Sequence, residues 1–370
     1  MNACPKCQNE TTLTHCVFCG IQISTPDRSN FPPVTWNEIR DEFVRRLMIE
    51  DEWIVQNEDS LTWWPGPVPQ KVYVSSRVEI EVDSEKETLI RVTVESELGR
   101  AKDRAKALEV VADLMIDYPF GSFVVLDDNT VLAIASVAIY GYSRSLIGLL
   151  TEEALVQATI AQELAPNLEG AGVVESTVAA HPVSGRRDVA DELVQSIYGN
   201  ESFVPTHPDL VPVRELVRAF WEKAILQGSV EPGFKNEEVT FVSYESRFDC
   251  GVGWRDDEFC AQKFGPSLMV WNNLAQTKNQ LTDEEMNSLN LMIAFEYELG
   301  LGHIGGVTQQ QLEDWNAIQH VAFLPFYFLQ SGESGLEGAI MKGFNGILQA
   351  SACARYAYRL LNPETEPQLD

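Results

Sequence analysis

Residues 72–98, VYVSSRVEIEVDSEKETLIRVTVESEL, decide the fold of the first large domain. Apolar side chains take alternate positions in two runs of this stretch, and polar side chains fill the positions between them. The apolar positions are Val72, Val74, Val78, Ile80 and Val82 in the first run, and Ile90, Val92, Val94 and Leu98 in the second. This period of two predicts two half-buried strands that pair antiparallel.

Helical and further strand patterns lie on both sides of these strands. Thr35-Trp-Asn-Glu38 is a capping box, and the apolar residues after it recur at helical spacing. The predicted order is a helix at 36–53, a strand near 61–68, the two strands above, a helix at 103–117, a hairpin of 121–127 and 130–140 that turns at Asp127-Asp128-Asn129, and a long helix from Ser143 to near Pro166. Residues 35–166 are therefore predicted to form one α+β domain.

The second half of the chain repeats this order of patterns. Glu215, Leu216 and Phe220 follow Glu38, Ile39 and Phe43 at a constant lag. The later patterns are β-rich segments at 240–254 and 268–270, a helix from the capping box at Thr282 to about Leu299, a strand at 321–329 and a long helix at 333–361. The sequence thus predicts tandem α+β domains at 35–166 and 211–363, joined by a connection at 167–210 that holds one helix near 188–198. Such halves can pair about a pseudo-twofold axis, although two unrelated α+β domains are the alternative.

Four of the seven cysteines lie in the first twenty residues, as two CxxC pairs: Cys4, Cys7, Cys16 and Cys19. Each pair can direct two thiolates to one point, and four thiolates make a closed tetrahedral zinc site with a structural role. Residues 1–22 are therefore predicted to form a zinc ribbon, followed by a proline-containing linker at 23–34. Free or oxidised thiols and a redox CxxC are the alternatives, and His15 is interpreted as a neighbour of the site.

The charge of the chain limits its partners. It has 27 Lys and Arg against 55 Asp and Glu, which gives a formal net charge of −28. Such a charge disfavours direct binding to phosphate backbones and to anionic membrane faces, and it favours basic or amphipathic protein partners. No apolar stretch is long enough for a membrane helix, and the N-terminus lacks the apolar core of a signal peptide. Together with the metal-type cysteines, this predicts a cytoplasmic protein.

Other candidate site residues are interpreted as structural. Gly300, Gly302 and Gly305 match GxGxxG, but a helical pattern precedes them where a dinucleotide fingerprint needs a strand. The other residues weighed are His181, His207, His303, His320, Cys250, Cys260 and Cys353, which have no ligand or catalytic spacing. Asp256-Asp257-Glu258 is interpreted as a solvated turn, with cation binding as the alternative. Trp63-Trp64 is expected either to offer exposed aromatic side chains to a protein or to pack against the sheet.

The stretch Ala107-Leu-Glu-Val-Val-Ala-Asp-Leu114, the hairpin after it and the helix from Leu149 to Leu164 resemble the bacterial type III secretion chaperone-like fold. The resemblance covers about 36–166 and, more weakly, 211–361. It implies paired α-β-β-β-α-β-β-α domains, which in chaperone members hold a partly unfolded client on apolar patches. The zinc ribbon and the long connection depart from that family.

The sequence therefore predicts a non-enzymatic protein-binding or chaperone-like module with a structural zinc ribbon and no catalytic residues. One alternative is a zinc-ribbon regulator that acts with nucleic-acid or transcription machinery, through a partner because of the negative charge. A second alternative is an enzyme whose site has no motif in the sequence.

We expect one tightly bound zinc ion per chain, held by Cys4, Cys7, Cys16 and Cys19, because structural zinc contributes about 10–16 kcal/mol of apparent binding free energy at pH 7. Elemental analysis of protein purified without chelator measures the zinc. Chelation is expected to unfold the ribbon alone, so a loss of the whole circular dichroism spectrum on chelation would contradict the prediction.

Overall fold

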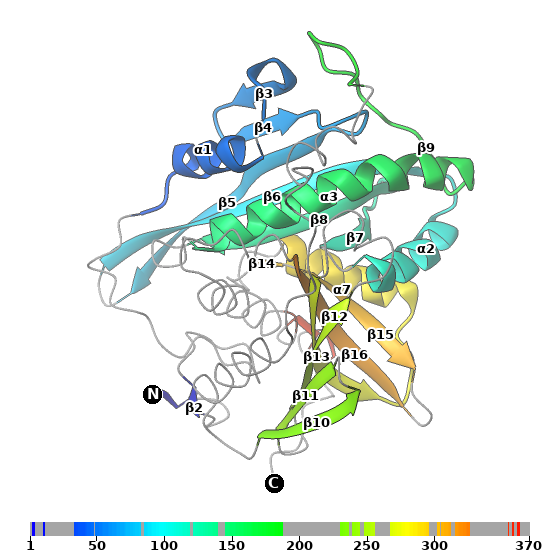
Figure 1. The fold of residues 1–370 in the computed structure, drawn as a ribbon. Helices are drawn as coiled ribbons and strands as arrows, with labels where there is room; N and C mark the ends of the chain where they lie inside the picture. The colour runs from blue at the N-terminus through cyan, green and yellow to red at the C-terminus, as the bar shows by residue number, and fades with distance from the viewer. Residues whose placement is uncertain are drawn as a thin grey trace.

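The strands predicted over 72–98 form the centre of the first of two large antiparallel sheets (Figure 1). The computed structural model describes residues 2–3, 10–11, 33–47, 49–82, 85–118, 121–139, 145–187, 230–236, 239–244, 248–255, 267–295, 302–303, 305–311, 315–325, 354, 357–358 and 361–362. The fold over these residues is α+β, as predicted, because helices pack on antiparallel sheets. No helix in this part of the chain is long and apolar enough to cross a membrane.

The first sheet is a meander that continues through a helix into a hairpin. Its strands are β3 (Ile54–Asn57), β4 (Ser60–Trp63), β5 (Gln70–Val82), β6 (Glu85–Ala101), β7 (Ser122–Val125), β8 (Thr130–Ile139), β9 (Val174–Glu175) and β14 (Gly302–His303). The order in space is β14-β8-β6-β5-β4-β3, with β7 also paired to β8 and β9 to β6. The predicted hairpin at 121–140 is thus confirmed, and its turn contains Asn129 at φ 71°.

Three helices accompany this sheet: α1 (Trp36–Arg46), α2 (Arg104–Asp117) and α3 (Ser145–Gly170). Thr35 caps α1 by accepting a hydrogen bond from the Glu38 N–H (3.3 Å), as the capping box predicts. Figure 1 shows α3 lying along one face of the sheet, where it contacts β6 and β8. The core on this face combines apolar side chains of α2, α3 and the sheet, among them Leu108, Val111, Phe123, Val156 and Ile160.

Two predicted helix ends are wrong. The helix expected to reach residue 53 ends at Arg46, because Ile54–Asn57 pair with β4 as a strand, after a short 3-10 turn at Asp51–Trp53. The helix expected to end near Pro166 continues to Gly170. Proline removes one helical hydrogen bond, but Leu164, Ala165 and Leu168 are buried on both sides of it, so packing holds the helix together.

The second sheet is also antiparallel and contains β10 (Val230–Asn236), β11 (Val239–Tyr244), β12 (Phe248–Arg255), β13 (Ser267–Thr277), β15 (Gly306–Gln311) and β16 (Asn316–Pro325), in the spatial order β10-β11-β12-β13-β16-β15. The helix α7 (Asp283–Phe295) lies between β13 and β15 in the chain. Thr282 and Glu285 cap it reciprocally, as predicted. The strand expected at 321–329 begins earlier, at Asn316, because it pairs with β15, which the sequence analysis did not predict.

Hydrogen bonds from α7 join the second half to the first sheet. The buried Asn287 side chain accepts from the Val125 N–H (2.8 Å) and donates to the Val125 carbonyl (2.9 Å), so it completes the open edge of β7. The buried Arg91 of β6 donates to the carbonyls of Ile293 and Ala294 at the end of α7 (3.3 and 3.0 Å). The strand β6 was predicted to be half-buried, but Arg91 and Thr93 are as buried as Val92 and Val94, because α7 covers the second face.

Several predicted elements lie outside the described residues. These are the zinc ribbon apart from the short paired strands β1 (Asn2–Ala3) and β2 (Glu10–Thr11), most of the linker at 23–34, the helix near 188–198 and the pattern at Glu215, Leu216 and Phe220. The described positions of the predicted last helix, at 354, 357–358 and 361, are helical. The connection predicted at 167–210 contains the end of α3 and β9.

Asn287→Ala is expected to lower the free energy of unfolding by about 2–4 kcal/mol, because it leaves a buried N–H and a buried carbonyl of Val125 without their partners. Denaturant unfolding measures the loss. Asn279→Ala, at an exposed position before the same helix, is the control and should change stability by less than about 0.5 kcal/mol. Equal effects of the two substitutions would contradict the prediction.

Candidate functional site

The four cysteines predicted to bind zinc lie outside the described residues. Within the described residues, no group of three or more His, Cys, Asp or Glu side chains is arranged to hold a metal ion. The zinc site at Cys4, Cys7, Cys16 and Cys19 therefore stays a prediction of the sequence.

The glycine motif lies between a helix and a strand. Gly302 belongs to β14, which pairs antiparallel with β8, and Gly305 has φ 83° directly before β15. A Cβ at Gly305 would stand 2.1 Å from the Val321 carbonyl oxygen, so this turn requires glycine. A dinucleotide fingerprint needs a strand before the glycines and a helix after them. Here α7 comes before Gly302 of β14, and β15 comes directly after the turn at Gly305, so the described glycines do not have the strand-to-helix setting of the fingerprint; Gly300 lies outside the described residues.

The histidines and remaining cysteines do not form a cluster in the described part of the chain. His181 lies in a loop after β9, His303 in β14 and His320 in β16, where it stands opposite Asn272 of β13. Cys250 is in β12. The residues that fall outside the described ranges are His207, Cys260, Cys353 and Asp256-Asp257-Glu258.

The two tryptophans of Trp63-Trp64 are buried, so the packing interpretation is confirmed and the exposed one is wrong. Trp63 Nε1 donates to Gln70 Oε1 (3.0 Å), and Gln70 Nε2 donates to the Ala154 carbonyl of α3 (2.8 Å) and to Gln157 Oε1 (2.9 Å). These buried polar side chains fix α3 on the sheet. Because they bond to one another and to α3, we assign them a structural role and not a role in ligand binding.

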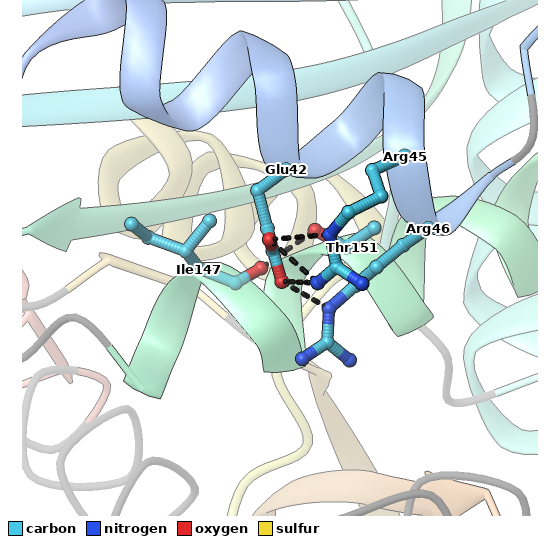
Figure 2. Close-up of polar contacts among 5 residues, drawn as sticks. All are labelled: Glu42, Arg45, Arg46, Ile147 and Thr151. Atoms are coloured by element: carbon cyan, nitrogen blue, oxygen red, sulfur yellow. Dashed lines mark hydrogen bonds and ion pairs between the residues drawn. The ribbon is translucent and has the colours of Figure 1, made fainter.

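A second polar cluster connects α1 with α3 (Figure 2). Both carboxylate oxygens of Glu42 accept from Arg45 Nη2 (2.8 Å), and Oε1 also accepts from Arg46. Burial raises the pKa of Glu42, but the hydrogen bonds and charges of the two arginines together outweigh it and lower the pKa. Arg46 lies over Gly148 of α3, where a Cβ would approach its Nη2 to 3.3 Å. The cluster therefore holds an ionised carboxylate in a structural contact and is unsuited to proton transfer.

A loop at 176–187, which we call the strap, crosses back to the start of β3. His181 and Gly185 exchange backbone hydrogen bonds, and His181 Nδ1 accepts from the N–H groups of Val183 (3.1 Å) and Ser184 (2.7 Å). The buried His181 ring stands edge-on to Trp64, with 4.7 Å between the ring centroids, and to Trp53, with 5.8 Å. The imidazole therefore organises the turn and attaches it to two tryptophans.

The strap also bonds to the residues that precede β3. Ser184 Oγ donates to the Glu52 carbonyl (2.9 Å), and Arg187 Nη2 pairs with the Glu50 carboxylate (3.1 Å). The Arg187 guanidinium lies 5.3 Å from the centroid of the Trp53 ring, within the range of a cation–π interaction. A basic side chain thus already binds one end of this segment.

Residues 50–59 form what we call the acidic edge. Within the described residues, β3 pairs with β4 alone, and it stands at the outer end of the sheet. Its acidic residues come directly before and directly after β3 in the chain: Glu50, Asp51, Glu52, Glu58 and Asp59. This site could not be predicted while residues 36–53 were assigned to one helix, because residues 51–53 form a 3-10 turn and a strand follows it. Five carboxylates in ten residues around Trp53-Ile-Val55 were the available signal.

His181→Ala is expected to release the strap and to accelerate tryptic cleavage after Arg186 and Arg187 about tenfold, because the two hydrogen bonds that Nδ1 accepts from the strap and the contacts with Trp53 and Trp64 are lost. Quantitative mass spectrometry of the cleavage products measures the rate. Val183→Ala, in the same turn with its side chain 88% exposed, is the control and should leave the rate unchanged. Equal rates in both variants would show that the imidazole does not hold the strap.

No protein-family model, curated protein or solved structure matches this chain. The resemblance to type III secretion chaperones therefore rests on the pattern of the sequence, and the function has to be argued from the geometry above.

Proposed function

We propose that this chain is a non-enzymatic protein-binding module of the chaperone-like kind. In this proposal two α+β units in tandem form an internal pseudo-dimer, and a zinc ribbon at Cys4, Cys7, Cys16 and Cys19 is a structural or docking appendage. The acidic edge is the observation that carries the binding role, since it presents open backbone and carboxylates together. Cysteines bind zinc only while they are reduced, and the cytoplasm keeps thiols reduced, so we place the protein there in this proposal.

The order of the strands supports the tandem arrangement. The first sheet runs β3-β4-β5-β6 as a meander, passes through α2 and returns as the hairpin β7-β8, with β8 against β6. The second runs β10-β11-β12-β13, passes through α7 and returns as β15-β16, with β16 against β13. Two unrelated α+β domains have no reason to share this path.

A β-bulge at matching places gives independent support. In the first sheet the register shifts between Glu97 and Gly99, opposite Leu132 and Val131. In the second it shifts between Asn273 and Ala275, opposite Gln319 and Ile318. The bulged positions correspond at an offset of 176 residues (97 to 273 and 99 to 275), and their partners correspond at an offset of 187 residues (132 to 319 and 131 to 318). Bulges are specific features of a family's sheet, so a shared position favours a common origin.

The edge strands add a third correspondence. Gly121 and Gly305 both have positive φ, at 135° and 83°, and each directly precedes the edge strand of its hairpin. The packing between the units is reciprocal, because α7 contacts β7 while α2 contacts β15, and the two helices contact one another. A twofold axis relates contacts in this way. The pseudo-dimer would bury both hairpin edges at its centre and leave β3 and β10 as its outer edges.

The charge of the outer edge supports binding to a protein. Asp51, Glu52 and Glu58 are exposed and have no ion pair within the described residues, whereas Glu50 pairs with Arg187 and Asp59 with Arg77. Carboxylates without cationic partners, in a chain of net charge −28, attract a basic partner and accelerate its association.

Affinity purification with the full chain tests the proposal, with the triple variant Asp51→Asn, Glu52→Gln and Glu58→Gln beside the wild type. We expect the wild type to capture a basic protein and the variant to capture about tenfold less, with the difference shrinking at high salt, where the Debye length falls from about 8 Å towards 3 Å. The matched control removes the same charge from exposed positions of α2, with Glu109→Gln, Asp113→Asn and Asp117→Asn.

Recovery of no protein by the wild type, together with turnover of a small molecule, would refute the proposed binding role. Equal capture by the triple variant and the wild type would show that the partner does not bind at the acidic edge.

A further inference from the structure

We propose that the outer edge of β3 binds an extended, lysine- or arginine-bearing segment of a partner as an added strand of the first sheet. This inference rests on the proposed protein-binding function and names the place and the manner of binding. It follows from the hydrogen-bonding pattern of β3, the position of the strap and the distribution of charge.

The backbone of β3 has free hydrogen-bonding groups on one side. The Trp64 N–H donates to the Trp53 carbonyl (3.1 Å), and residues 54–57 continue the same register with β4. Because paired residues of antiparallel strands alternate between bonded and non-bonded positions, the N–H and carbonyl groups of Ile54 and Gln56 point away from β4. None of these four groups has a partner within the described residues. Four such groups in a row are the template that strand addition uses.

The strap sets one limit of this template. The Glu52 carbonyl, in the 3-10 turn directly before β3, already accepts from Ser184 Oγ. The other limit is the β3–β4 turn at Glu58 and Asp59. An added strand therefore has room opposite residues 54–57, between two acidic ends.

Charge identifies the occupant. Carboxylates flank the template at both ends, so a segment with basic residues at corresponding positions makes favourable cross-strand pairs, while an acidic segment is repelled. The same repulsion excludes a second copy of β3, which would place like charges opposite one another. At one end of the acidic edge, the Glu50 carboxylate already pairs with a guanidinium, that of Arg187.

The outer strand of the other sheet differs in a way that supports this choice. The strand β10 contains Pro232, which has no N–H and protects an edge from strand addition. The strand β3 contains no proline. Of these two outer strands, β3 is therefore the one in which every residue has a backbone N–H to donate.

The test uses the full chain and the fluorescent peptide Lys-Val-Lys-Val-Lys-Val-Lys, with Glu-Val-Glu-Val-Glu-Val-Glu as the acidic counterpart. Gln56→Pro removes an outward N–H that the fold does not use, and Gln56→Ala is the matched control that keeps it. We expect the basic peptide to bind the wild type and Gln56→Ala alike, and Gln56→Pro at least about tenfold more weakly. Amide exchange at Ile54 and Gln56 should slow on binding to the wild type, a readout that does not depend on how the proline variant folds.

Several results would overturn the inference: no binding of the basic peptide at 1 mM, equal binding of the acidic peptide, or protection of amides elsewhere with none at Ile54 and Gln56. A cellular partner captured equally by Gln56→Pro and the wild type would also refute strand addition while leaving the protein-binding function intact. Capture of no protein by the wild type would refute that function itself.

Discussion

A guanidinium buried inside one sheet binds the end of a helix that packs against the other, and the two halves of the molecule depend on this contact. Arg91 of β6 is fully buried, and its Nη1 donates to the last carbonyls of α7, which carry the negative end of the helix dipole. Ser136 of β8 donates to the Ala294 carbonyl as well (2.9 Å). Buried charge is costly without such partners, so the sheet and α7 require one another.

This dependence also explains what could be predicted from the sequence. The hairpin at 121–140, the caps of α1 and α7, and the long strands β5 and β6 could be predicted from local patterns, because the residues that determine each of them are close together in the chain. The burial of Arg91 and Thr93 could not be predicted from alternation. Polar residues on one face of a strand normally indicate solvent, and only the arrival of a helix some two hundred residues later changes their environment.

The candidate site was missed for a related reason. Residues 50–53 continue the polarity of α1, and a single sequence does not show that pairing with β4 outcompetes a longer helix. The strap depends on contacts between distant residues, such as Trp64 Nε1 with the Ala179 carbonyl (3.0 Å), which no local pattern reports. In contrast, the zinc site stays a prediction that rests on the spacing of the cysteine pairs alone, because metal ligation requires residue types at fixed positions.

The long separation between Arg91 and its partners affects how the chain is made. The first sheet can pair through β9 once residue 175 has been synthesised, but the helix that covers its second face ends at Phe295. At 5–20 residues per second, a ribosome takes about 6–24 s to add the residues between them. During that interval the face that α7 later covers is open to water, and it carries the apolar Leu132 and Ile134 beside the polar Arg91 and Ser136. The polar side chains interrupt the apolar surface of this face, so we expect it to aggregate less readily before α7 is made than a wholly apolar face would.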